Sequence, residues 1–336
     1  MREGILLFGS MTADINYLID RWPEQDTVAQ IASFEVLPGG PPQNCASALM
    51  KLGAPFPVMI ESALGDDSYG DTVIRISQDG GLDMSAVRRL PGVASPQTHV
   101  MVVKDTGRRT FFYCPGANAL IRSTDFDVNT SAPARIFYAG APGLLPAIDN
   151  SQTAGWPSLF SKAQAAGYKT AIEMVTIAPQ ENARMVAPCL PHLDYLVVND
   201  NEAGALAGIT LDQDGGFQWQ EAARACEILM AKGVSQAVAI HHPQGAVSLH
   251  KGGQPVAAGA VNIPKAEIRS TVGAGDAFSA GYHFGLHEGW PAIQCLQLAN
   301  AAAATSLRSM STSDAVMRAD ECLTWASLLG VRPTGL

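Results

Sequence analysis

Short apolar runs alternate along most of the chain with longer segments whose apolar positions recur at helical spacing. The apolar runs are typical of buried strands, and they occupy residues 4–9, 57–61, 136–139, 169–173, 195–198 and 237–240. The segments of helical spacing occupy residues 42–52, 69–77, 157–166, 179–190 and 219–232, and nearly all of 274–329. This alternation predicts an α/β fold with a mostly parallel sheet and helices on both faces.

Two regions, residues 15–37 and 98–113, show strand-type alternation with no helix between the runs. We predict that they form a small antiparallel sheet, built from insertions at about 12–38 and 97–116 into a single α/β domain spanning 1–330. Such a sheet is a candidate lid that excludes water from a reaction; the alternative is a pair of ordinary surface hairpins. Because exposed lid strands have edges that need covering, a homodimer through these strands is a further expectation.

Composition narrows the class of protein. The chain has 336 residues, of which 47% are hydrophobic, so it can bury a large core. A net charge of −9 argues against a nucleic-acid or anionic-membrane surface. The six cysteines include no CxxC pair and predict reduced core thiols. With no secretory layout at the start and no apolar run near ~18 residues, we expect a soluble cytoplasmic protein.

The segment 270–276, Ser-Thr-Val-Gly-Ala-Gly-Asp, precedes a long run of small residues that reads as a helix. The amides of Gly273, Ala274 and Gly275 would lie at its N-terminus, where unpaired N–H groups and the helix dipole favour an anion. Asp276 would then act as a base that takes a proton from a hydroxyl while the amides hold the phosphoryl group being transferred. The alternative is a plain strand-to-helix turn with an ordinary first-turn carboxylate.

Other polar residues follow predicted strands, where ligands bind in open α/β sheets. They occur at residues 12–14, 39–44, 115–118 and 199–202. Each has a structural alternative: Asp14 could be a turn residue, and Asn199 with Glu202 three positions later matches a helix capping box. Their joint position at strand ends is what favours a binding site.

Taken together, these motifs resemble the ribokinase-like (phosphofructokinase B type) carbohydrate kinase family. The match runs in family order from Ile5 to about Ser313. It comprises Gly39-Gly40-Pro41-Pro42-Gln43-Asn44-Cys45-Ala46 on to Gly53, the lid segments 107–112 and 116–118, Asn199-x-x-Glu202, and Thr271-Val272-Gly273-Ala274-Gly275-Asp276 with Phe278, Ala280 and Gly281.

The resemblance implies a three-layer, doubly wound, mostly parallel sheet with a small antiparallel β lid. It also implies ATP and Mg²⁺ as cofactors and a sugar as substrate. The site residues it implies fall into four groups: Asp14, Gly39, Gly40, Asn44 and Asn118 toward the sugar; Asp276 as base with Gly273–Gly275 as anion hole; Asn199 and Glu202 organising magnesium through water; and Thr271, Gly245 and Asn300 on the nucleotide side.

The chain departs from the family pattern on the nucleotide side. Ser270 stands where the family has an Asp that helps to order a monovalent cation, which leaves potassium activation open. The loop 240–245 lacks a hydroxyl and a glycine that meet the nucleotide phosphates, and it carries His241 and His242 instead. These histidines either replace a phosphate contact or cap the strand; a paired metal site is disfavoured because they alternate faces. Residues 309–313 lack the usual glycine.

The leading interpretation is an ATP-dependent kinase that phosphorylates a hydroxymethyl group of a small ribose- or fructose-like sugar. A nucleoside kinase is one alternative, with Phe112 or Tyr113 stacking on the base. A non-catalytic sugar-binding regulator is another. A phosphorylated substrate is less favoured because no cluster of Lys or Arg other than Arg108 and Arg109 is expected near the pocket. Since neighbours in a strand face opposite sides, one of these two would face solvent.

Overall fold

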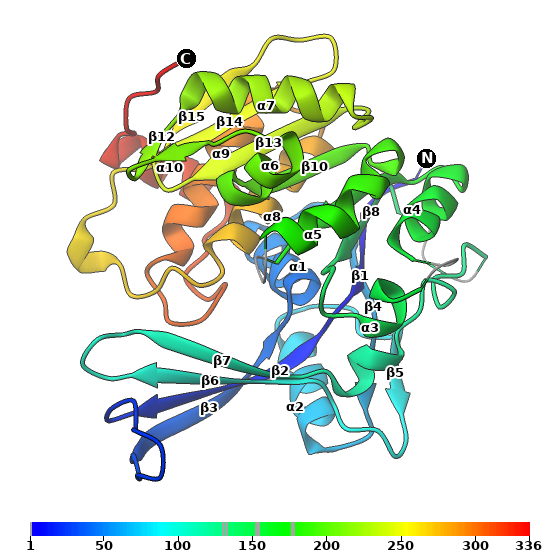
Figure 1. Ribbon diagram of the computed structural model, residues 1–336, viewed down its shortest axis with the longest axis vertical. Coiled ribbons are helices and arrows are strands. Elements are labelled where there is room, and N and C mark those ends of the chain that lie inside the picture. The colour runs from blue at the N-terminus through cyan, green and yellow to red at the C-terminus, as the bar shows by residue number, and fades with distance from the viewer. Residues whose placement is uncertain (1, 130, 132–133, 152–154, 176–178) are drawn as a thin grey trace.

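The predicted apolar runs form six strands of the main sheet, and three further strands, at residues 87–90, 245–250 and 256–259, were not predicted from the sequence. The computed structural model describes residues 2–129, 131, 134–151, 155–175 and 179–336 (Figure 1). Within these residues the sheet has nine strands, in the order β15-β14-β13-β10-β9-β8-β1-β4-β5. The strands β13, β14 and β15 pair antiparallel, and the other neighbours pair parallel. Their bounds are β1 Ile5–Gly9, β4 Val58–Gly65, β5 Val87–Leu90, β8 Ile136–Gly140, β9 Lys169–Glu173, β10 Tyr195–Asn199, β13 Ala237–His242, β14 Gly245–His250 and β15 Val256–Gly259.

Helices cover both faces of this sheet, as the alternation predicts. The described helices are α1 Pro41–Leu52, α2 Ser68–Asp79, α3 Pro146–Asp149, α4 Trp156–Ala165, α5 Pro179–Val186, α6 Asp200–Ala207, α7 Trp219–Ala231, α8 Ala274–His287, α9 Ala292–Ser306 and α10 Ala319–Leu329. Short 3₁₀ turns occur at η1 Gly116–Leu120, η2 Ala187–His192 and η3 Lys265–Glu267.

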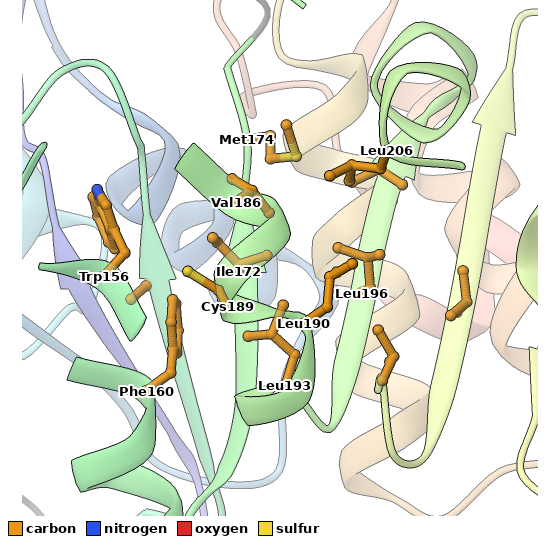
Figure 2. Packing of buried hydrophobic residues seen from close by; sticks show 14 of the residues in the cluster. Trp156, Phe160, Ile172, Met174, Val186, Cys189, Leu190, Leu193, Leu196 and Leu206 are labelled. Atoms are coloured by element: carbon orange, nitrogen blue, oxygen red, sulfur yellow. The ribbon is translucent and has the colours of Figure 1, made fainter. Parts of the chain in front are cut away.

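Alternate residues of the strands point to opposite faces of the sheet, where the described buried residues form three hydrophobic clusters. Leu6 and Phe8 of β1 pack into the core under α4–α7, whereas Ile5 and Leu7 pack into the core under α1, α8, α9 and α10. Figure 2 shows the first core, where Phe160 of α4, Ile172 of β9 and Leu196 of β10 lie among the labelled side chains. The three-layer doubly wound arrangement is therefore confirmed.

The regions without a helical pattern form a separate four-stranded sheet, called the small sheet below. It consists of β2 Thr12–Ile19, β3 Ile31–Gly39, β6 Gln97–Val103 and β7 Arg109–Cys114, in the order β3-β2-β6-β7. It lies below the main sheet in Figure 1. Its two outer pairs are antiparallel, but the central pair β2–β6 is parallel, because the chain crosses the main sheet between these two strands.

Smaller differences have local causes. The helix predicted over 179–190 ends at Val186 and continues as η2, where Pro188 and Pro191 cannot donate the backbone bonds of an α-helix. A two-residue hairpin, β11 Asp212–Gln213 with β12 Gly216–Phe217, is absent from the sequence prediction. Five cysteines are buried and free, as expected, but Cys114 on β7 is exposed. Among the described helices, none combines the length and apolarity needed to cross a membrane.

Candidate active site

The N-termini of α1 and α8 meet at the carboxyl ends of the central strands. Asn44 in the first turn of α1 donates from Nδ2 to Oδ2 of Asp276 in the first turn of α8, at 2.8 Å. The Oδ1 atom of Asn44 accepts a bond from Thr312 Oγ1 at 3.1 Å. Both ends of the Asn44 amide are therefore engaged, which orients it and holds one oxygen of the Asp276 carboxylate.

The environment of Asp276 suits a base. Burial raises its pKa to about 6, the charge of Asp14 acts in the same direction, and the bond from Asn44 opposes both. A carboxylate with this pKa is ionised at neutral pH and accepts a proton more readily than an ordinary aspartate. Within the described part of the chain, no hydrogen bond is recorded to Asp276 Oδ1, so this oxygen can face a hydroxyl.

The backbone before α8 forms a candidate anion site. Gly273 is the N-cap, with φ 83°, and provides no side-chain cap. A Cβ at Gly273 would lie 2.6 Å from Cα and Cβ of Thr312, so this close approach requires glycine. Ala274 N already donates to Thr271 O, over a long 3.4 Å. The amides of Gly275 and Asp276 precede the first intrahelical bond, from Ala277 to Gly273, and point out of the helix.

Asp14 follows β1, as the sequence suggested, and lies within the next strand, β2. Thr12 Oγ1 donates to its Oδ1 at 2.6 Å. Burial raises the pKa of Asp14, and hydroxyl bonds from Thr12 and Thr98 counter this. A Cβ at Gly39 would lie 2.1 Å from Oδ2 of Asp14, so Gly39 makes room for the carboxylate. The next residue, Gly40, is the N-cap of α1.

Asn118 is fully buried in η1 and engaged with the protein itself. Its Nδ2 donates to Met11 O at 3.1 Å and to Tyr113 Oη at 2.9 Å. These bonds use both amide hydrogens and hold the link between β1 and β2, the segment that leads into Asp14. The structure thus gives Asn118 a positioning role, and its contact with a sugar stays a prediction.

Asn199 and Glu202 form a complete capping box at the start of α6, so the structural alternative for this motif is confirmed. Glu202 is buried. Burial, with the charges of Asp276 and Glu202, raises the pKa of Glu173 at the end of β9 well above its ordinary value. Tyr138 Oη donates to Glu173. Glu173 therefore senses the charges of both Asp276 and Glu202, and carboxylate oxygens are the donors that a divalent ion prefers.

The nucleotide side of the predicted site brings His241 to the anion site. A Cβ on Gly275 would lie 3.7 Å from Cε1 and 3.9 Å from Nε2 of His241. Its ring packs on Phe278 of α8 at 4.8 Å between centroids. Burial lowers the pKa of His241 to about 4, so the imidazole is neutral at pH 7. No hydrogen bond to either ring nitrogen is recorded within the described residues.

His242 points to the opposite side of β13, as the alternation predicts. Its ring stacks on Phe217 at 4.7 Å, and its Nε2 lies 3.0 Å from Asp212 Oδ2. With Asp200 these two groups form a trio whose ligand atoms lie within 4.8 Å of one another. Gln244 N donates to His242 Nδ1, so a neutral ring carries its proton on Nε2 and donates to Asp212. That nitrogen has no lone pair for a metal.

The other nucleotide-side residues have structural roles as well. Ser270 is buried, and its Oγ accepts from Val272 N at 3.0 Å. Gly245 begins β14 in close contact with Ala258 O. Asn300 donates from Nδ2 to Ala258 O and Gly259 O, which joins α9 to β15. It lines a pocket of about 880 Å³ between β15, α9, α10 and residues 330–334, a volume typical of small-molecule sites. Thr271 is exposed.

Two adjoining pockets lie on the face of the small sheet that carries Asp14. The first is narrow, about 30 Å³, and is lined by Asp14, Val272 and Thr312 among others. The second, about 370 Å³, continues outward. Asn16, Arg109 and Met310 line both pockets.

Sequence reasoning missed several of these residues. Thr312 lies in the segment that departs from the family motif, and its bond to Asn44 could not be read from spacing. Glu173 was predicted as the last residue of an apolar strand but not as a site residue. An acidic residue at the end of a buried strand was the signal that could have identified it. Arg109 was named from the sequence as a cation near the pocket, but Met310 was not; the two come from positions about 200 residues apart, with Nη2 of Arg109 at 4.0 Å from the Met310 sulfur.

The chain is similar to known carbohydrate kinases in sequence and in fold. The family profile described as pfkB family carbohydrate kinase matches residues 2–319. A ribokinase of Arabidopsis thaliana is 26% identical over 309 residues, covering 89% of this chain and 74% of the relative. An ATP-dependent ribose-1-phosphate kinase of Halopiger xanaduensis is 26% identical over 324 residues, covering 93% and 96%. The structure of A. thaliana ribokinase with ribose and ATP superposes with a TM-score of 0.78 at 21% identity, over 97% and 99% of the two chains.

Proposed function

The chain belongs to the pfkB family of carbohydrate kinases, and from that premise we propose that it transfers a phosphoryl group from ATP to a hydroxymethyl group of a small ribose- or fructose-like sugar. The observation that carries this proposal is the meeting of Asp276, Asn44 and the unpaired amides of α8. A base and an anion site lie within one helical turn of each other, which is the arrangement that in-line phosphoryl transfer needs.

In the proposed reaction the accepting hydroxyl lies against Oδ1 of Asp276 and gives up its proton as it attacks. Asn44 keeps the carboxylate oriented through Oδ2. The amides of Gly275 and Asp276 stabilise the negative charge on the transferring group. Asp14 accepts hydrogen bonds from hydroxyls elsewhere on the sugar, and Gly39 and Gly40 let the backbone approach it.

The nucleotide is proposed to lie on the β13 side of α8. His241 would donate one ring N–H to a phosphate oxygen, in the place of the hydroxyl that the family loop usually supplies. Thr271, Gly245 and Asn300 are the further residues proposed on this side. Magnesium, when bound, neutralises charge across the phosphates, and Glu202 with Asn199 would hold it through water.

We propose the small sheet as a lid. The inner pocket beside Asp14 is too narrow for a sugar as it stands, so the small sheet would move to admit one and then exclude water. The opposite face of the small sheet exposes Phe34 by 67% and Phe112 by 50%, with Phe112 stacked on Trp22. A second copy of the chain is the proposed cover for these rings.

Light scattering tests the proposed dimer. A dimer that becomes monomeric in Phe34→Lys supports it, and a monomeric wild-type protein at micromolar concentration excludes it.

A nucleoside kinase remains the second candidate. Of the aromatic residues first considered for stacking on a base, Phe112 faces away from the pocket, and Tyr113 donates to Leu144 O and accepts from Asn118. Phe111 is the ring that lines the inner pocket.

A substrate panel separates the candidates. ADP release would be measured with ribose, fructose, deoxy-sugars, sugar acids, nucleosides and fructose phosphates. Turnover of a sugar and not of a nucleoside supports the leading proposal, and the reverse pattern overturns it. If none is turned over but a sugar raises the melting temperature, the protein is a sugar-binding regulator.

A further inference from the structure

Register places Arg109 on the same face of the small sheet as Asp14. Arg109 pairs with Val102, which pairs with Leu18, two positions along the same face from Asn16 and four from Asp14. Its neighbour Arg108 faces the other way and is exposed. At roughly 6.7 Å per two residues, the backbone of Arg109 lies about 13 Å along the strands from the row of Asp14. An extended arginine side chain covers about half of that span.

The guanidinium of Arg109 lies where the two pockets join. Arg109 is half-buried and lines the narrow pocket beside Asp14 as well as the outer pocket of about 370 Å³. Met310, which contacts it at 4.0 Å, lines both pockets too. A molecule with one end at Asp276 and Asp14 would therefore present its other end to Arg109.

No carboxylate neutralises this cation in the portion of the chain that is described. Asp20, near the tip of the small sheet, pairs with Arg21 at 2.6 Å. Glu35 lines the outer pocket, but no ion pair joins it to Arg109. Burial lowers the pKa of Arg109, and no neighbouring charge contributes to that shift. A partly desolvated guanidinium without a counter-charge favours an anion, above all one that accepts two parallel hydrogen bonds.

We propose that Arg109 binds a carboxylate or phosphate at the end of the sugar remote from the accepting hydroxyl, so that the preferred substrate is an anionic sugar. This inference rests on the proposed sugar kinase function and specifies its substrate class. Asp14 and Asp276 then act on hydroxyls at one end, while Arg109 recognises the charge at the other. Both carboxylate and phosphate present the planar pair of oxygens that a guanidinium binds.

Matched pairs of sugars test the proposal. Sorbitol and gluconate share a carbon chain and a hydroxymethyl end but differ by a carboxylate, and fructose and fructose 6-phosphate differ by a phosphate. We expect the wild-type kcat/KM to favour the anionic member of at least one pair by about 10-fold or more. The first pair identifies a sugar acid, and the second a sugar phosphate. Equal or better turnover of both neutral members would overturn the proposal.

Variants of Arg109 and of its neighbour Arg108 test which residue causes the preference for the anionic sugar. Arg109→Gln should remove the preference mainly by raising KM for the anionic sugar, while the neutral sugar changes by no more than about 3-fold. Arg109→Lys should restore part of it, since it keeps the charge but loses the paired bonds. Arg108→Gln, one position along the same strand, is the matched control and should change neither sugar. An equal loss for both sugars in Arg109→Gln would show a structural role instead.

Calorimetric titration keeps this test separate from the proposed function. Gluconate or fructose 6-phosphate should bind wild-type protein more tightly than its neutral partner, and Arg109→Gln should abolish the difference, whether or not any sugar is turned over. Anion-selective binding without turnover would reject the kinase proposal and retain the Arg109 assignment. Turnover without anion selectivity in binding would retain the kinase proposal and reject the Arg109 assignment.

Discussion

On the proposed sugar side of the candidate site the polar side chains bond to one another in two separate groups, whereas the donors on the proposed nucleotide side lack such bonds among the described residues. Thr312 bonds to Asn44 and Asn44 to Asp276, and Thr12 bonds to Asp14. Toward the nucleotide, the donors are backbone amides of α8 and the imidazole of His241. The first arrangement is oriented by bonds within the protein, while the second would acquire its partners from the proposed nucleotide.

This contrast follows from what each side must recognise. Sugar hydroxyls differ in position, so a base and its acceptors must be oriented in advance. Phosphate oxygens are alike and strongly charged, so amides at a helix N-terminus serve without side-chain specificity. With the proposed assignment, this difference would explain why the nucleotide loop departs from the family pattern while the sugar motif does not.

The largest effect should come from removing the base. Asp276→Asn is nearly isosteric but cannot accept the hydroxyl proton, so kcat should fall on the order of 10²-fold or more. Sugar affinity, measured by calorimetry, should change little. Asp314→Asn, an exposed acid in the segment that contains Thr312, is the control. Activity near the wild-type level in Asp276→Asn would remove the base from the proposal.

The two adjacent histidines offer the sharpest test of the nucleotide side. His241→Ala should raise the KM for ATP by about 10-fold, because a hydrogen bond to a charged phosphate is lost. His242→Ala should leave that KM nearly unchanged, since its ring faces Asp212 and Phe217. The KM for ATP of both variants would be determined from initial rates at varied ATP concentration. Equal effects from both variants would mean that position on β13, and not contact with phosphate, is responsible.

Alanine substitutions at the two glycines at the start of α8 should differ in their effect on the stability of the protein. Gly273→Ala places a Cβ 2.6 Å from Thr312 at positive φ, so we expect a loss of about 1–3 kcal/mol in the free energy of unfolding. Gly275→Ala meets no atom closer than 3.7 Å and should remain about as stable as the wild type. Urea denaturation measures both. Equal stability of the two variants would contradict the close approach between Gly273 and Thr312.

The smallest expected effect concerns pH. The pKa of Asp276 is raised to about 6, and its base form is the ionised one, so kcat/KM should fall as pH drops through about 6. Asn44 lowers this pKa through its hydrogen bond, so Asn44→Leu should move the acid limb to higher pH. The pH profile of both proteins would be recorded. A limb that stays in place, or moves down, would show that Asn44 does not control the carboxylate.

Much of the fold and part of the candidate site could be predicted from the sequence alone. Continuous apolar runs and helical spacing predicted six of the nine described strands of the main sheet and most of the longer helices within a few residues, because burial on both faces of a parallel sheet demands continuous apolar runs. The strands β5, β14 and β15 were not predicted. Gly273, Gly275 and Asp276 predicted an anion site with a base, since glycine and a first-turn carboxylate have local chemical meanings. The capping box of Asn199 and Glu202 was likewise local.

Packing decided what joins distant segments. The bond from Thr312 to Asn44, the ring of His241 against Gly275 and the position of Arg109 opposite Met310 unite residues far apart in the chain. Which of Arg108 and Arg109 faces the pocket depended on the register of β7 against β6, and a shift of one residue would exchange them. Local patterns carry no information on such contacts, because they arise only when the two sheets and α8 come together.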